Sequence, residues 1–156
     1  MNTEPARSLI HAPDGGLGYA LSRAARAWRG EVERALPAGV TSAQFFVLMA
    51  IRRAEIRRRV GPTQHDIAER LDMDPNTASQ VIRSLEHHRL LARSAHPRDG
   101  RAWTLTLTDS GRATAVDCSR RVRSVNANFF GILNPDSARQ LADLLATLTD
   151  AAEERR

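Results

Sequence analysis

TQHDIAERLDMDPNTASQVIRSLEHHRLLARSAHPRDGRAWTLTL, residues 63–107, is the stretch that decides the fold, because its hydrophobic period changes once along its length. Its first part has the spacing of two short helices, over residues 63–71 and 75–89, separated by a three-residue turn. Thr63 can cap the first helix, and Pro75 at the first position is typical of a helix start. Two short helices joined in this way predict a helix–turn–helix.

The second part of the stretch predicts a β-hairpin. Residues 91–95 and 102–107 have the composition of strands, and the second of them alternates with β-branched threonines. Residues 96–101, HPRDGR, are a polar turn that contains proline, Asp-Gly and two arginines. A hairpin with a basic tip directly after a helix–turn–helix predicts a winged helix–turn–helix.

Amphipathic helices flank this unit on both sides. Apolar residues at steps of three and four predict them over residues 17–36, 42–58, 109–131 and 136–152. Prolines and glycines make residues 1–16 a flexible N-terminal arm. The predicted fold is therefore mainly α with a small β-hairpin wing (α+β). One compact domain holds a winged helix over residues 41–108 between flanking helices within 17–40 and 109–156.

The composition fits one globular domain whose charge is unevenly distributed. The chain has 156 residues, of which 42% are hydrophobic and only 4% aromatic, and this favours a core of packed helices. The net charge is +5, and residues 52–112, with 12 arginines against 8 acidic residues, carry +4 of it. A basic segment indicates a polyanionic partner. A solvated arginine-rich surface is the alternative that charge alone leaves open.

Cysteine content and hydropathy indicate where the protein works. The single cysteine, Cys118, excludes an intramolecular disulfide, which is typical of a reducing cytoplasm, and we expect it to be a buried, inert thiol. No apolar run approaches the ~20 residues that span a bilayer. The N-terminus also lacks the pattern of a signal peptide. We therefore expect a cytoplasmic protein with no membrane partner.

The outer side of the predicted helix 75–89 offers groups that can hydrogen-bond to base edges of double-stranded DNA. A helix fits the major groove, and its exposed side must not repel phosphates. This side has short polar groups and one arginine, without an acid: Asn76, Thr77, Ser79, Gln80 and Arg83. Thr63 and Gln64 begin the preceding helix, where a phosphate is favoured. At the hairpin tip, Arg98 and Arg101 can enter a minor groove, with Asp99 orienting Arg101.

Over roughly residues 17–150, the chain resembles the MarR-type (multiple antibiotic resistance regulator) transcriptional regulators. The similar segments are residues 63–71, 77–86, 97–102 and 107–112. The resemblance implies a homodimer, joined by the first and the last two helices, that binds a near-palindromic promoter site. It also implies a repressor that a small aromatic or anionic effector releases. The family usually has a glycine at the end of the recognition helix, where this chain has Arg89, and a left-handed cap there would be strained.

Other functions have weaker support in the sequence. Trp28, Phe45 and Phe46 can line an effector pocket, although a plain core role is more common for such side chains. No metal site or cofactor is predicted, and no nucleophile–base pair or phosphate loop indicates an enzyme. The alternative function is a winged helix that docks proteins and does not bind DNA. It should expose large apolar residues on the outer side of 76–83, and the sequence has none there.

Overall fold

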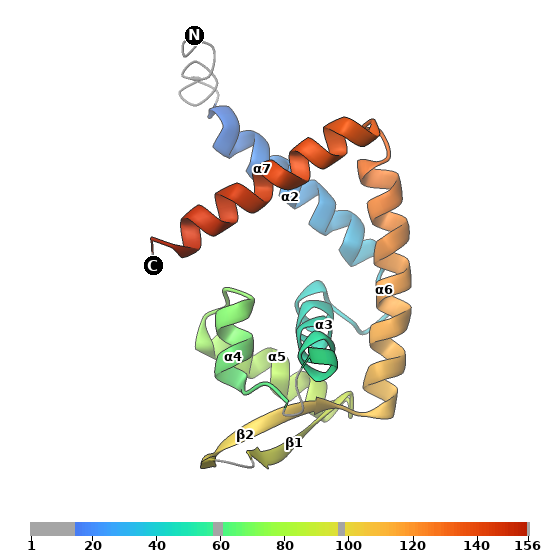
Figure 1. The fold of residues 1–156 in the computed structure, drawn as a ribbon. Helices are drawn as coiled ribbons and strands as arrows, with labels where there is room; N and C mark the ends of the chain where they lie inside the picture. Colours follow the sequence, from blue (N-terminus) through green and yellow to red (C-terminus); the bar gives the residue numbers. More distant parts are fainter. Residues whose placement is uncertain (1–14, 58–60, 97–98, 156) are drawn as a thin grey trace.

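The computed structural model describes residues 15–57, 61–96 and 99–155, and for residues 99–101 it describes the backbone. The elements in chain order are α2 (Gly16–Ala35), α3 (Ser42–Arg57), α4 (Gln64–Arg70), α5 (Pro75–His87), β1 (Leu91–His96), β2 (Asp99–Leu107), α6 (Asp109–Phe130) and α7 (Pro135–Glu153). This order confirms the predicted fold class. We call α3, α4, α5 and the β1–β2 wing the winged unit, and α2, α6 and α7 the flanking helices. In Figure 1 the winged unit lies below, α6 runs along its side, and α2 and α7 cross above it.

Side-chain caps begin the helices of the winged unit, at Thr63 as predicted and also at Thr41 and Asp74. The Thr63 hydroxyl accepts from the Asp66 N–H, and the Asp66 carboxylate accepts from the Thr63 N–H, so that α4 begins with a capping box. Asp74 accepts from the first N–H groups of α5. Thr41 and Gln44 bond reciprocally at the start of α3. Hydrogen bonds between sequence neighbours therefore determine where these helices begin.

The wing is an antiparallel hairpin that is attached to the helices at its base. Leu91 pairs with Leu107 across the two strands, and both side chains are buried. The N–H of Leu105 donates to the carbonyl oxygen of Pro62 at 2.8 Å, just before α4. The N–H of Leu107 donates to Oε1 of Glu55 on α3, also at 2.8 Å. The base of β2 therefore cannot move independently of α3 and of the segment that leads into α4.

Two hydrophobic clusters form the core. The larger lies within the winged unit and extends to the start of α6: Val47, Leu48, Ala50, Ile51, Ile67, Ile82, Leu85, Leu91, Leu105, Leu107 and Ala115. The smaller joins α2, α3 and α6: Val32, Leu36, Phe45, Cys118 and Val122. Met49 packs against both clusters. Helix α3 therefore takes part in both clusters, and the start of α6 adds a second direct contact between the flanking helices and the winged unit.

The turn between α5 and β1 is held by the start of α6. Arg89 has a φ of 56°, so that the predicted left-handed cap is confirmed at a residue that is not glycine. Its carbonyl oxygen accepts from the hydroxyls of Thr108 at 2.7 Å and Ser110 at 2.8 Å. A Cβ on Gly111 would lie 1.7 Å from the carbonyl oxygen of Leu90, so only glycine allows α6 to approach this turn.

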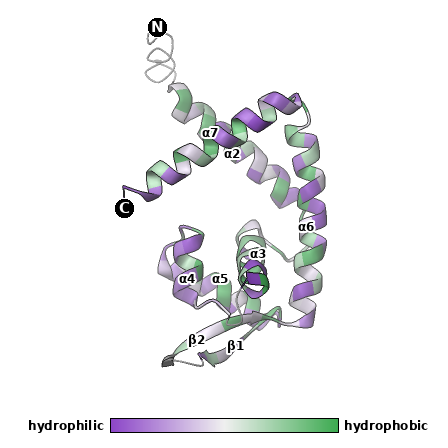
Figure 2. Ribbon diagram, in the orientation of Figure 1, coloured by the Kyte–Doolittle hydropathy of each residue, from purple (hydrophilic) through white to green (hydrophobic). Residues whose placement is uncertain are grey.

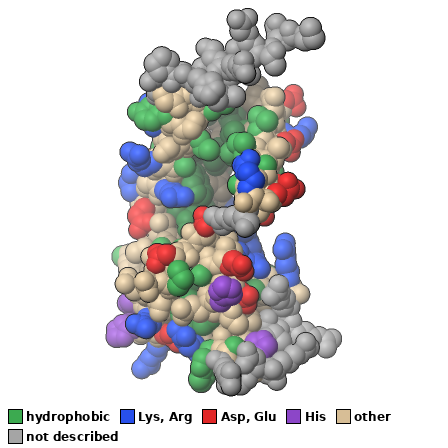
Figure 3. All heavy atoms as spheres, turned by 90° about the vertical axis from the view of Figure 1, so that its left-hand side faces the viewer, with side chains coloured by type: hydrophobic (Ala, Val, Ile, Leu, Met, Phe, Trp, Pro, Cys, Tyr) green, Lys and Arg blue, Asp and Glu red, His purple; other side chains and the backbone are tan. Residues whose placement is uncertain are grey.

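Apolar side chains are exposed on α2 and α7. In the described part of the chain, α7 has no buried residue. The exposed leucines are Leu17, Leu21, Leu141, Leu144, Leu145 and Leu148. Figure 2 shows apolar and polar residues alternating along both helices, and Figure 3 shows hydrophobic side chains gathered on the upper half of one face. None of the described helices has the length and apolar character that crossing a membrane requires.

Candidate nucleic-acid interface and ligand cavity

Helix α5 turns its predicted polar side to solvent. Its other side enters the core through Ala78, Ile82 and Leu85. Ser79 is half-buried, and the remaining predicted contact residues are exposed: Asn76, Thr77, Gln80 and Arg83. No large hydrophobic side chain of α5 is exposed, and every residue of this helix is described. The helix therefore lacks the apolar surface that the protein-docking alternative requires.

The polar side chains on this side of α5 differ in whether they already form hydrogen bonds within the protein. The Thr77 hydroxyl donates to the carboxylate of Asp74, the N-cap of α5. This hydrogen bond, helped by backbone N–H donors, holds the pKa of Asp74 below its ordinary value. Among the described residues, the side chains of Asn76, Gln80 and Arg83 make no hydrogen bond. These three remain available to a partner, whereas Thr77 supports the cap.

The start of α4 lies against the wing. Thr63 is half-buried and forms an isolated backbone bridge with Thr104 of β2. Gln64 is also half-buried, and its Oε1 lies 3.5 Å from Nη2 of Arg93 on β1. Nε of Arg93 donates to Oε1 of Glu86 on α5 at 2.8 Å. The two predicted phosphate contacts are thus adjacent to the wing. Arg93 was not predicted, because its partners are distant in sequence.

The predicted minor-groove contacts are Arg98, Asp99 and Arg101. Arg98 is outside the described residues. The backbones of Asp99 and Arg101 belong to β2, but their side chains are outside the described part, so that the Asp99–Arg101 pair stays a prediction. Nearby on β2, Trp103 is 55% exposed.

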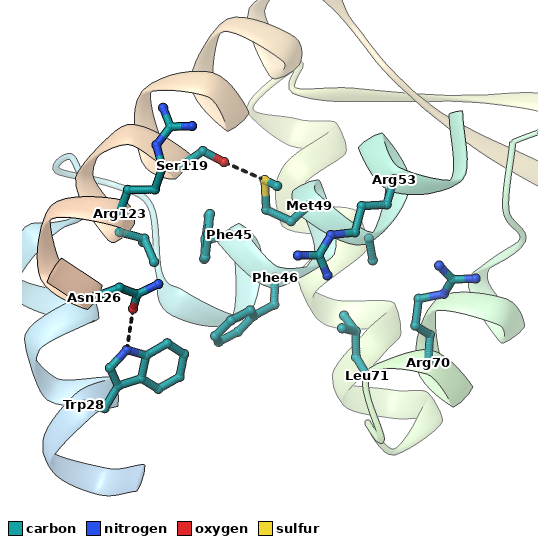
Figure 4. A pocket seen from close by; sticks show the side chains of 12 residues that line it. Trp28, Phe45, Phe46, Met49, Arg53, Arg70, Leu71, Ser119, Arg123 and Asn126 are labelled. Carbon is teal, nitrogen blue, oxygen red and sulfur yellow. Dashed lines mark hydrogen bonds between the residues drawn. The ribbon is translucent and has the colours of Figure 1, made fainter. Parts of the chain in front are cut away.

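A cavity of about 370 Å³ lies between the flanking helices and the winged unit, beside the contacts that join them. Side chains from α2, α3, α6 and the end of α4 line it: Trp28, Phe45, Phe46, Met49, Ala50, Arg53, Arg70, Leu71, Ser119, Val122, Arg123 and Asn126. Figure 4 shows the aromatic rings of Trp28 and Phe46 toward one side, and the guanidinium groups of Arg53 and Arg70 toward the other. The cavity therefore combines flat apolar surfaces with positive charge.

The polar groups of the cavity are suited to an anion. Nε1 of Trp28 donates to Oδ1 of Asn126 at 2.9 Å, which fixes the indole against α6. The three arginines, Arg53, Arg70 and Arg123, form no ion pair with any described residue. A guanidinium group in a partly apolar site binds a carboxylate through two parallel hydrogen bonds. A planar molecule with one carboxylate would match this lining in size and charge.

Trp28, Phe45 and Phe46 belong to the core and also line the cavity, whose role as an effector pocket stays a prediction. Phe45 is buried in the smaller core cluster, and the other two pack against it. All three also line the cavity. The arginines of the cavity were missed, since they come from three helices and no local pattern unites them.

Cys118 lies in the smaller core cluster. Its side chain is fully buried, as expected, and burial raises the pKa of the thiol. A thiol that is both inaccessible and protonated reacts slowly. Over the described ranges, no three His, Cys, Asp or Glu side chains gather in a way that could hold a metal ion.

Comparison with known proteins gives one consistent family. The sequence model of the MarR family matches residues 38–102. The HTH-type transcriptional repressor MdtR of Bacillus subtilis (strain 168) is 30% identical over 115 residues, which cover 74% of this chain and 71% of MdtR. This match includes the winged unit and extends well into the flanking helices.

Two solved structures are similar over most of their length. The transcriptional repressor CouR, bound to a 23-mer DNA duplex, has a TM-score of 0.79 and 29% identity over 90% of this chain and 96% of that chain. BpsR of Bordetella bronchiseptica, whose DNA binding is regulated by 6-hydroxynicotinic acid, has a TM-score of 0.76 and is 29% identical. The match covers 85% of this chain and 98% of the BpsR chain. Sequence, fold and the polar side of α5 agree: this chain belongs to the MarR family and is a winged-helix DNA-binding transcriptional regulator, not an enzyme.

Proposed function

We propose that the protein is a repressor that binds a near-palindromic operator as a homodimer and leaves it when a small aromatic anion enters the cavity. The observation that carries the DNA part is the outer side of α5, where three polar side chains are exposed without a partner among the described residues. The similarity to MdtR and CouR, both described as repressors, supports the direction of control.

Each part of the winged unit has a distinct role in this proposal. Asn76 and Gln80 hydrogen-bond to base edges, and Arg83 contacts a guanine or a phosphate. Ser79 and Thr77 lie on the same side of α5 and add shorter-range contacts. Thr63 and Gln64 contact the backbone, and Arg98 and Arg101, with Asp99, reach the minor groove from the wing.

The homodimer is inferred from the flanking helices. Leu144 and Leu148 of α7 are 56% and 60% exposed, and Leu17 and Leu21 of α2 are 56% and 48% exposed. Exposed leucines that recur along two neighbouring helices need a cover, and a second copy supplies a matching surface by two-fold symmetry. Two copies would present two α5 helices to successive major grooves, which is why we expect a near-palindromic site.

The effector is assigned to the 370 Å³ cavity. Its ring would lie against Trp28 and Phe46, and its carboxylate would pair with Arg53, Arg70 or Arg123. BpsR responds to 6-hydroxynicotinic acid, an aromatic carboxylate, and makes that compound the first probe to test. The lining includes Arg70 and Leu71 at the end of α4, so that an occupant contacts the winged unit directly.

We infer a cytoplasmic location from the proposed partner and from the cysteine content. A chromosomal operator has to be reached in the compartment that contains the DNA. A single buried thiol fits a reducing environment.

Binding to DNA from the promoter region of the chain's own gene tests the contact residues. Arg83→Ala and Arg101→Ala should each weaken binding by about 1–3 kcal/mol where the arginine contacts a base. Arg120→Ala is the control, because Arg120 is an exposed arginine on α6, paired with Asp117 and outside the winged unit. Unchanged binding by both test variants would show that these side chains do not contact DNA.

A further inference from the structure

Arg93 lies where the wing meets both helices of the helix–turn–helix. It faces the buried Leu105 across the hairpin. Its Nε donates to Oε1 of Glu86 at 2.8 Å, and its Nη2 lies 3.5 Å from Oε1 of Gln64. The side chains of Arg93 and Glu86 are 28% and 30% exposed, so that water screens this pair less than it screens a surface pair. One guanidinium group thereby connects β1, α5 and α4.

We propose that Arg93 is the positioning residue of the DNA interface: it fixes the wing relative to α5 and orients the amide of Gln64 toward a phosphate. The inference rests on the proposed DNA-binding function and deepens it. A winged helix must place α5 and the wing tip in two grooves at once, so the distance between them has to be fixed before binding. Among the described residues, Arg93 is the only side chain of the wing strands that hydrogen-bonds to α5.

The amide orientation follows from the chemistry of the pair. A guanidinium group has donors only, so the group of Gln64 that it faces is the carbonyl oxygen. The amide nitrogen, with two donors, is then directed away from Arg93. A phosphate accepts hydrogen bonds and does not donate them, so this is the end of Gln64 that a DNA backbone requires.

Arg93 also compensates a charge that DNA would oppose. Glu86 is the only acidic residue of α5. A carboxylate on the recognition helix repels phosphates unless a cation neutralises it. Arg93 does so from the wing, and therefore one side chain both joins the two elements and removes the repulsion.

The test compares binding to operator and to scrambled DNA at several salt concentrations for Arg93→Gln, Arg93→Lys and the control Arg120→Gln. Arg93→Gln should lose about tenfold in operator affinity and much less in affinity for scrambled DNA, because the fixed arrangement matters only when both grooves are occupied. Arg93→Lys should fall between wild type and Arg93→Gln, since an ammonium neutralises Glu86 but lacks the planar fork. Arg120→Gln should leave both affinities unchanged.

The salt dependence separates positioning from direct contact. If Arg93 positions other groups, its loss leaves the slope of log affinity against log salt nearly unchanged. A slope reduced by about one, with equal losses on both DNAs, would mean that Arg93 is itself a phosphate contact and would overturn the proposal. Wild-type affinity of Arg93→Gln for the operator would also overturn it. Absence of DNA binding by the wild-type protein would overturn the proposed function, and this inference with it.

Discussion

The winged unit and the flanking helices differ in how much of their apolar surface is buried, and in how many of their polar groups are bonded, within one chain. The winged unit has side-chain caps on its helices, a common apolar core and polar connections to the wing from Glu55 on α3 and Glu86 on α5. Helix α7 has no buried residue among those described, and its leucines are exposed. The difference indicates that one chain suffices to form the core of the winged unit. The exposed leucines of the flanking helices instead need a second copy of the chain to cover them, as the proposed homodimer provides.

A third region, the cavity, lies between the two and takes residues from both. Arg70 and Leu71 come from the winged unit, and Trp28 and Arg123 come from the flanking helices. Because Met49 packs against both core clusters, a ligand in the cavity would act where the two regions meet.

The largest effect is expected from two glycine substitutions in the flanking helices, one where α6 packs against the turn between α5 and β1 of the winged unit and one on the exposed α2. Gly111→Ala should destabilise the fold by about 3 kcal/mol or prevent folding, because the new Cβ would lie 1.7 Å from the carbonyl oxygen of Leu90. Gly18→Ala, in α2, meets nothing within 4 Å and should be neutral or stabilise the helix by up to about 1 kcal/mol. Denaturant unfolding measures both. Equal losses would contradict the assignment of the turn as the tightly fitted region.

The next effect concerns assembly. Leu144→Glu combined with Leu148→Glu should weaken the dimer by more than about a hundredfold, since each removes an exposed apolar side chain and adds charge at the inferred interface. Analytical ultracentrifugation should show a monomer, and circular dichroism should show the helix content of the winged unit retained. Asp143→Glu on the same helix is the control. A dimer that persists in the double variant would place the interface elsewhere.

A smaller effect is expected at the cavity. Arg53→Gln should weaken binding of 6-hydroxynicotinate by about tenfold, because a carboxylate would lose one charge-assisted partner. Isothermal titration calorimetry gives the affinity, and Trp28 fluorescence in the Trp103→Phe background reports occupancy of the site. Arg57→Gln, also on α3 but not in the lining, is the control. Equal affinity of the two variants would remove Arg53 from the site.

The smallest effect is expected at the strained turn. Arg89→Gly should stabilise the protein by about 1 kcal/mol, because glycine accepts a φ of 56° without a steric penalty. The carbonyl oxygen that Thr108 and Ser110 bond is retained in the variant. Thermal unfolding at neutral pH measures the change. A lower stability of the variant would mean that contacts of the Arg89 side chain add more to the free energy of unfolding than the left-handed backbone conformation subtracts from it.

Features set by neighbouring residues could be predicted from the sequence. The caps at Thr41, Thr63 and Asp74 are of this kind, since donor and acceptor are two or three residues apart. The strain at Arg89 was expected on another ground, namely the resemblance to a family that usually has glycine at the end of this helix. The order of elements followed from these caps and from the change of hydrophobic period.

Features that depend on packing could not be predicted. Gln44 shows the boundary: its Oε1 accepts from the N–H of Thr41, three residues away, whereas its Nε2 donates to the Ser84 hydroxyl on α5, 40 residues away, at 2.9 Å. The cavity arginines and the Arg93 network are of the same kind, because each joins segments that only the folded chain brings together. The sequence identifies such residues as polar and does not tell which other segment they meet.

The most direct test of the central claim is selection of bound duplexes from a random DNA pool, with the wild-type protein and the Leu144→Glu/Leu148→Glu variant in parallel. We expect the wild type to enrich an inverted repeat, with half-site centres about 10–10.5 base pairs, or a multiple of this, apart. The double variant should enrich at most a single half-site. Failure of the wild type to enrich any inverted repeat, at low as well as moderate salt, would contradict a dimer that presents two α5 helices to DNA.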